Sequence, residues 1–345
     1  MGMNDWDPSF TQEARGRRFS GPGGRLKSAA SAAAIVVLMA ACAPAVSPTS
    51  APSSAASASS DPAGPTAASA FPLTLIDDEG TSVAIPAEPQ RLVSLTPGTT
   101  EILFALGVGE RVLATDSGSD YPAAAEQLPD VAAFGTVDAE RIVGLEVDLV
   151  IAGGSGYTPP DAMAKLRSLD IPVIVVYAAT VAGVSDDVEL VAKAVGRATE
   201  GTVLAATMRA DIAALTAAVS SLPKPRTFYE VDATTAIYGP ADHSFLAEMV
   251  ELAGGSPVTS GAADTFEIPL ERLIAADPEV IILGDAAFGT TVDAVAERPG
   301  WGVLTAVRNG AVRVADDKLI TRPGPRLAQG LRSLILAINP GAALP

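Results

Sequence analysis

The 345-residue chain contains a single histidine, His243, and a single cysteine, Cys42. A disulfide within the chain is therefore impossible, and the nitrogen and sulfur ligands that usually build a Zn²⁺, Mn²⁺ or Cu site are missing. We expect no metal site and no intrinsic cofactor, so that any metal reaches the protein inside an organic chelate. His243 follows Asp242 in a pattern more typical of a turn residue than of a ligand.

Positive charge is also scarce. The chain has 23 Lys and Arg against 40 Asp and Glu, a formal net charge of −17. Such an acidic surface argues against binding nucleic acid or lying flat on anionic lipid. Catalytic and cofactor motifs are incomplete. The segment Gly153–Gly156 lacks the spacing of a nucleophile elbow. The segment Gly107–Gly109 lacks the third glycine of a dinucleotide fingerprint and follows a predicted helix, whereas the fingerprint must follow a strand. We expect that the protein is not an enzyme and has no catalytic residues.

The N-terminal apolar run, Ala29–Ala41, is too short to span a bilayer. Basic residues precede it, and small residues lead from it to Cys42. This pattern predicts a lipoprotein signal peptide over residues 1–41, with Cys42 diacylated as the mature N-terminus; a plain secretory signal is the alternative. Residues 42–70 are almost wholly Ala, Ser, Pro and Thr, which predicts a disordered tether.

One sequence pattern occurs twice. Residues 140–153 return as residues 271–284 without a gap, and the Glu, the Arg, the last Ile and the Gly are identical. Each copy predicts a short helix that opens with a Glu-Arg pair, then a turn, then a buried parallel strand that ends in glycine. Two copies this far apart indicate two related α/β lobes and are too widely spaced for a solenoid.

Predicted strands and helices alternate from Phe71 onward, which indicates parallel sheets. We expect an N-terminal α/β lobe over 71–198, a linking helix over 199–223 and a C-terminal α/β lobe over 224–345. The helical pattern before and into the linking helix is interrupted near Gly196 and Gly201. The predicted strands are 73–76, 82–85, 91–95, 112–115, 149–152, 173–176, 226–231, 280–283 and 311–314, and the predicted helices outside this stretch are 99–106, 161–169, 245–253 and 326–338.

Several motifs, in this order, resemble those of the substrate-binding proteins of ABC importers for vitamin B12, ferric siderophores and haem. They are residues 77–80, 89–103 and 120–122, the two Glu-Arg repeats, and 322–326. The resemblance extends from Phe71 to the C-terminus. It implies two Rossmann-like lobes joined by one long helix, with the ligand cleft between the lobes, in a monomeric protein.

The resemblance also implies a partner. Glu140 and Glu271 would lie at the tops of the two lobes and dock onto arginines of an ABC permease dimer that carries ATPase subunits. Charge-assisted pairs of this kind fix register and orientation. The alternative is that each Glu only stabilises the positive end of its helix.

The ligand-binding residues implied by motif position are Pro97, Phe134, Gly153, Gly154, Tyr157, Tyr238, Phe266 and Arg322. Aromatic faces suit a large planar chelate, and the guanidinium group would pair with ligand oxygens. In the alternative interpretation, Phe134 and Phe266 are core residues and Arg322 makes a local salt bridge.

We predict a solute-binding lipoprotein outside the cytoplasm, held at the membrane only by lipidated Cys42. A corrinoid is the first choice of ligand, on the motifs at 120–122 and 322–326. A ferric siderophore is the second, and haem is the third because no pair of axial ligands stands out, although His243 would still be able to contact a haem or corrin ring. Gly153 departs from those B12-binding relatives that carry an aromatic residue there. A lipoprotein that senses the same ligand and signals to a partner is a further alternative.

Overall fold

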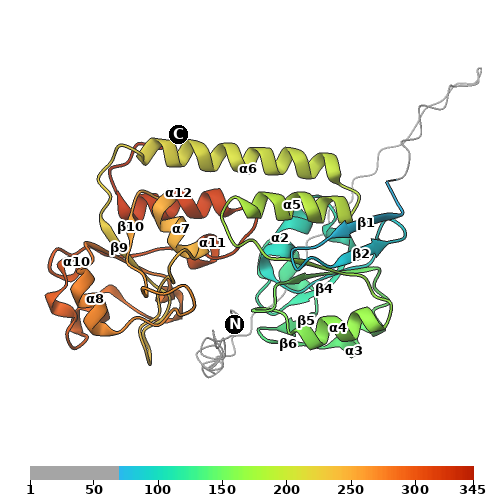
Figure 1. Ribbon diagram of the computed structural model, residues 1–345, viewed down its shortest axis with the longest axis horizontal. Coiled ribbons are helices and arrows are strands. Elements are labelled where there is room, and N and C mark those ends of the chain that lie inside the picture. Colours follow the sequence, from blue (N-terminus) through green and yellow to red (C-terminus); the bar gives the residue numbers. More distant parts are fainter. Residues whose placement is uncertain (1–69) are drawn as a thin grey trace, which may run out of the picture. The chain divides into compact units, whose positions relative to one another are not determined.

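The computed structural model describes residues 70–345. The predicted signal peptide, Cys42 and nearly all of the predicted tether lie outside the described residues. Within the described part, two α/β lobes with parallel sheets are joined by one long helix, as the sequence predicts (Figure 1).

The N-terminal lobe is built on a six-stranded sheet in the order β6-β5-β4-β3-β7-β8. Neighbouring strands pair in parallel except β5 and β6, which are antiparallel. A separate antiparallel hairpin, β1 (Leu73–Ile76) with β2 (Ser82–Ile85), precedes the sheet. The strands are β3 (Leu92–Ser94), β4 (Val112–Asp116), β5 (Asp130–Ala133), β6 (Thr136–Val137), β7 (Leu149–Gly153) and β8 (Val173–Val176), and the helices are α2 (Pro97–Ala105), η1 (Gly109–Arg111), η2 (Ala125–Gln127), α3 (Ala139–Gly144), α4 (Pro160–Ser168) and α5 (Gly183–Ala194).

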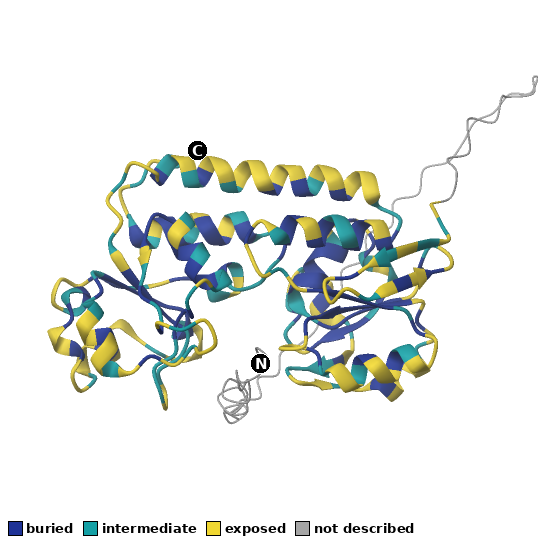
Figure 2. Ribbon diagram, viewed as in Figure 1, coloured by how far each residue is buried: buried dark blue, intermediate teal, exposed yellow. Residues whose placement is uncertain are grey.

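The C-terminal lobe is built on a four-stranded, wholly parallel sheet in the order β10-β9-β11-β12. Figure 2 shows the inner strands of the sheets as buried, which matches their continuous apolar sequences. The strands are β9 (Arg226–Glu230), β10 (Ser256–Pro257), β11 (Val280–Leu283) and β12 (Val312–Val314), and the helices are α7 (Phe245–Leu252), α8 (Leu270–Ala276), η3 (Asp285–Phe288), α9 (Val292–Glu297), η4 (Trp301–Val303), α10 (Thr305–Arg308), α11 (Asp317–Ile320) and α12 (Leu327–Ile338).

The linking helix is α6 (Ala198–Val219), 22 residues long. Gly196 has a φ of +73° and separates α5 from α6, as predicted. The second predicted interruption is wrong, because Gly201 lies inside α6. A Cβ at Gly201 would lie 2.2 Å from the Cβ of Ala192, so glycine is needed there for the close approach of α5 and α6. Among the described residues, α6 is also the one helix whose length and composition would suit a membrane span, but here it packs against α5 and α12.

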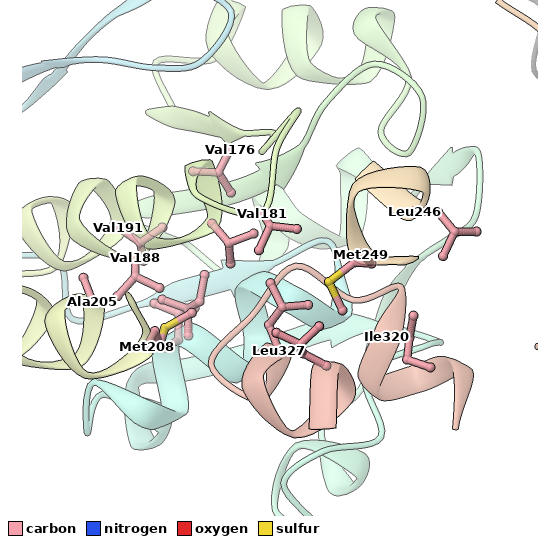
Figure 3. Packing of buried hydrophobic residues seen from close by; sticks show 14 of the residues in the cluster. Val176, Val181, Val188, Val191, Ala205, Met208, Leu246, Met249, Ile320 and Leu327 are labelled. Atoms are coloured by element: carbon pink, nitrogen blue, oxygen red, sulfur yellow. The ribbon is translucent and has the colours of Figure 1, made fainter. Parts of the chain in front are cut away.

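One hydrophobic cluster contains residues of both lobes. Figure 3 shows Val188 on α5, Ala205 and Met208 on α6, Met249 on α7 and Leu327 at the start of α12 as members of this cluster. Because these side chains are buried together, a wide rotation of one lobe against the other would expose apolar surface. The shared core therefore favours a small relative motion of the lobes.

Two kinds of boundary differ from the sequence predictions. The helix predicted from Thr99 begins at Pro97, since proline is well suited to the first turn of a helix, where its missing N–H is not needed. Strand β3 is shorter than predicted at both ends. The sequence analysis also missed the short elements β5, β6, β10 and α9 to α11, which lack a long periodic pattern.

A buried carboxyl group on α5, that of Asp187, makes the stability of the fold depend on pH. Burial, with Asp78 nearby, raises the pKa of Asp187 from 3.8 to about 8. The group is therefore protonated in the fold at neutral pH but ionised in the unfolded chain, so its stabilising contribution is present below pH 3.8 and is lost as pH rises toward 8. We expect Asp187→Asn to raise the Tm at pH 8 by about 5 °C and to change it little at pH 4, measured by calorimetry. Asp211→Asn, at an exposed position on α6, is the control; an equal gain in Tm at both pH values would contradict this reasoning.

Candidate functional site

The candidate site lies where the parallel strands of the lobes end, because loops at the carboxyl ends of such strands usually bind ligands. In the N-terminal lobe, Pro97 opens α2 just after β3, and Gly153 is the last residue of β7. A Cβ at Gly153 would lie 2.6 Å from Thr96 Cγ2, and a Cβ at Gly154 would lie 2.8 Å from Cγ of Tyr177. The two glycines are buried and let neighbouring side chains pack directly on the backbone of this loop.

Aromatic side chains gather near the same strand ends. Phe134 and Tyr157 make an edge-to-face contact, with ring centroids 5.9 Å apart and an interplanar angle of 72°. Burial, with Tyr177 and Asp317 nearby, raises the pKa of Tyr157 to about 12, although the residue as a whole is 43% exposed. The phenol of Tyr157 is therefore neutral at physiological pH and available as a hydrogen-bond donor.

The sequence analysis missed one residue of this group. Tyr177 directly follows β8 and is exposed, and its backbone N donates to Asp78 Oδ2 at 2.6 Å. The rule applied to the other strands, that residues just after a strand line the site, would have found Tyr177. Tyr121, which was noted only as part of a motif, is also exposed.

In the C-terminal lobe the predicted residues lie in the segments that follow β9 and precede α8. The backbone of Tyr238 forms isolated antiparallel β-bridges with Asp232 and with Glu267. The N–H of Gly239 donates to the carbonyl of Phe266 at 2.9 Å. These backbone bonds place Tyr238 and Phe266 on neighbouring extended segments, both partly buried. Phe288, at the end of η3 after β11, is exposed, and His243 sits in a turn with a φ of +59°.

Arg322 connects the two lobes. Its Nη1 donates to Asp120 Oδ1 at 2.6 Å and its Nη2 to the carbonyl of Gly118 at 3.1 Å. Lys318 adds a second cation, with Nζ 2.5 Å from Asp120 Oδ2. Partial burial opposes ionisation of Asp120, but the hydrogen bonds from Arg322 and Lys318 prevail and lower its pKa to about 2. Arg322 therefore makes a salt bridge, as in the alternative interpretation, but the bridge joins the two lobes and is not local.

A second ion pair lies beside the first. Arg326 donates from Nε to Glu101 Oε2 at 2.9 Å and from Nη2 to Oε1 at 2.5 Å. The side chain of Glu101 is only 3% exposed, and the guanidinium carbon of Arg326 lies 3.9 Å from the ring centroid of Tyr121. The motifs at 120–122 and 322–326, which suggested a corrinoid, thus form a joint contact between the lobes.

The two sequence repeats fold into the same local structure. In the first copy, Arg91 Nε donates to the carbonyls of Leu145 and Glu146, and Arg91 N donates to Asp148 Oδ2. Glu146 adopts a left-handed φ of 49°.

The second copy repeats each of these contacts. Arg226 Nε donates to the carbonyls of Ala276 and Asp277, and Arg226 N donates to Glu279 Oε2. Asp277 has a φ of 42°. The repeat predicted from sequence is therefore confirmed as a structural duplication, in which an arginine closes the turn between helix and strand.

Glu140 and Glu271 occupy the same position in this duplicated unit, the second residue of α3 and of α8. Both are exposed, and the side chain of Glu140 is 90% accessible. Glu140 Oε1 lies 3.9 Å from Lys165 Nζ, and a surface pair this long holds the carboxylate only weakly. The geometry is compatible with docking at both positions.

Comparisons with known proteins support the resemblance. The protein YvrC of Bacillus subtilis (strain 168), named as an uncharacterized ABC transporter substrate-binding lipoprotein, is 29% identical over 275 residues, covering 78% of this chain and 86% of YvrC. The vitamin B12-binding protein of Vibrio parahaemolyticus serotype O3:K6 is 29% identical over 251 residues, covering 71% of this chain and 88% of that protein.

Solved structures agree. The periplasmic heme-binding protein RhuT from Roseiflexus sp. RS-1, in apo form, has a TM-score of 0.67 and 28% identity, covering 74% of this chain and 99% of RhuT. The periplasmic vitamin B12-binding protein BtuF of Vibrio cholerae has a TM-score of 0.64 and 27% identity, covering 73% of this chain and 97% of BtuF. The expected fold class, two lobes with a cleft between them, is confirmed.

A family model described as periplasmic binding protein matches residues 92–319, which is most of the described chain. Together with the two α/β lobes, the linking helix and the duplicated helix-strand unit, this match shows that the chain belongs to the periplasmic binding protein family.

Proposed function

We propose that this protein is the extracytoplasmic substrate-binding component of an ABC importer and that its ligand is a corrinoid. The family match carries the first part. The second part is supported by the relatives named as vitamin B12-binding proteins and by the aromatic residues at the strand ends. Phe134, Tyr157 and Tyr177 on one lobe, with Tyr238 and Phe266 on the other, offer flat apolar surface to a large chelate.

Haem is the second candidate. RhuT, named as a heme-binding protein, has a fold like that of this chain. The exposed residues Tyr121 and Tyr177 also supply phenol oxygens of the kind that can ligate haem iron. A ferric siderophore is third, and a sensing lipoprotein for the same ligands is the alternative role.

Titration of the purified protein with cobalamin, cobinamide, haemin and a ferric siderophore, followed by calorimetry, tests the ligand. We expect a corrinoid to bind in the micromolar range or tighter. Phe134→Ala with Tyr238→Ala should weaken this binding about 30-fold or more, because each lost aromatic contact is worth about 1–2 kcal/mol.

Val203→Ala, at an exposed position on α6, is the control and should bind as the unmodified protein does. Tight binding of haemin with no response to corrinoids would overturn the choice of corrinoid and leave the carrier function standing. Binding of free Zn²⁺ or Mn²⁺ instead would refute the inference from the missing histidines and cysteines.

The proposed importer role also requires a place at the membrane and a permease partner. We propose that lipidated Cys42 anchors the protein on the outer side of the cell membrane. We also propose lobes over 71–198 and 224–345, with a linking segment over 199–223 that holds nearly all of α6. Glu140 and Glu271 are proposed to pair with arginines of the two permease subunits. Their exposure and their equivalent positions in the duplicated unit support this role.

A further inference from the structure

Each duplicated helix exposes an aliphatic side chain at the same position. Val143 on α3 is 39% exposed and Ile274 on α8 is 36% exposed. Each lies three residues after the Glu of its own helix, so on each helix the aliphatic side chain and the Glu side chain are neighbours on the surface. Each lobe thus presents a carboxylate beside an aliphatic group, and the pair occurs twice.

The other shared side chains of the duplicated unit have structural roles. Ile142 and Leu273, one residue before the exposed aliphatic groups, are fully buried and hold each helix on its lobe. Arg141 Nη1 donates to the carbonyl of Asp130 at 2.7 Å, and Arg272 Nε donates to that of Thr259 at 2.9 Å. The arginine of each Glu-Arg pair therefore ties its helix to the neighbouring segment.

Folding buries most, but not all, of each aliphatic residue, since Val143 stays 39% and Ile274 36% exposed. A β-branched residue loses side-chain freedom in a helix, and the part that stays exposed gains no burial in return. Two such residues at equivalent positions, each next to an exposed Glu, indicate a surface that another molecule covers.

The surface near Glu140 is also hollow. A depression of about 340 Å³ between α3 and α4 is lined by Asp138, Glu140, Asp161 and Lys165, with three apolar residues. Three carboxylates and one amine give the hollow a net negative charge, which suits the insertion of a basic side chain.

We propose that Val143 and Ile274 are contact residues of the docking surface, and that each permease subunit meets one lobe with a basic side chain set beside an apolar socket. This inference rests on the proposed function and adds the apolar half of the partner site. Because the two lobes present the same pair of groups, the partner is expected to offer two equivalent sites. Apolar cover around each ion pair excludes water and strengthens the charge interaction.

The test uses a double variant that carries both Val143→Thr and Ile274→Thr, and compares it with the unmodified protein. Threonine keeps the β-branched shape, so the fold should be retained. We measure binding to the permease–ATPase complex of the same organism in proteoliposomes, at low and at high salt. We expect affinity to fall about tenfold, with a steeper loss at high salt, while the affinity for the transported ligand stays unchanged.

A matched control replaces two exposed aliphatic residues away from this surface, Leu169→Thr with Val203→Thr, and should dock normally. If the Val143 and Ile274 variant docks normally while Glu140→Gln with Glu271→Gln does not, this inference is overturned and the proposed docking stands. If neither variant affects docking, the docking part of the proposed function fails as well.

Discussion

Arg326→Met is expected to lower the free energy of unfolding by about 3 kcal/mol, because it leaves the buried carboxylate of Glu101 without its main partner. Glu101 lies in α2 of the N-terminal lobe, and Arg326 immediately precedes α12 of the C-terminal lobe. Methionine keeps much of the apolar volume of the arginine stem, so the loss of unfolding free energy comes from the missing charge and not from a cavity. Denaturant unfolding followed by circular dichroism measures it.

Two comparisons make this result specific. Arg209→Met removes an arginine that pairs with Asp186 and Glu189 on the surface, and should cost no more than about 1 kcal/mol. Adding Glu101→Gln to Arg326→Met should recover part of the loss, because the buried charge is then gone. Equal losses for Arg326→Met and Arg209→Met would show that the contact between the lobes is no stronger than a surface pair.

Glu140→Gln combined with Glu271→Gln is expected to reduce ligand uptake at least tenfold. Each proposed charge-assisted pair with a permease arginine would contribute about 1.5–3 kcal/mol, and glutamine keeps the size of the side chain without its charge. Because both side chains are exposed and lie on the duplicated helices, the affinity of the isolated protein for its ligand should not change. Uptake into proteoliposomes and calorimetry on the same protein batch measure the two quantities.

The control for this experiment is Glu126→Gln combined with Glu200→Gln, which removes the same charge from exposed positions elsewhere. Its uptake should match that of the unmodified protein. A large loss of ligand affinity or of folded protein in the Glu140 and Glu271 variant would instead place these residues among the structural ones.

Some features were predicted from local sequence because local rules decide them. The apolar runs of β7, β8 and β11 and the long helix α6 follow from periodicity and length. The duplicated helix-strand unit was visible as a repeat, and the resemblance to a binding-protein family followed from motif order. Short elements such as β5, β6 and α9 were missed because two to six residues carry too little pattern.

The sequence by itself determined the two-lobe α/β class, the exposed docking candidates and the lack of a histidine or cysteine metal site. Only the tertiary structure decided what Gly201 and Arg322 do. Gly201 suits a close helix contact with Ala192, and Arg322 joins Asp120 across the lobes. Both depend on residues that are distant in sequence or on another helix. Sequence periodicity reports which face of an element is buried, whereas the partner of a glycine or an arginine is set by how the elements pack together.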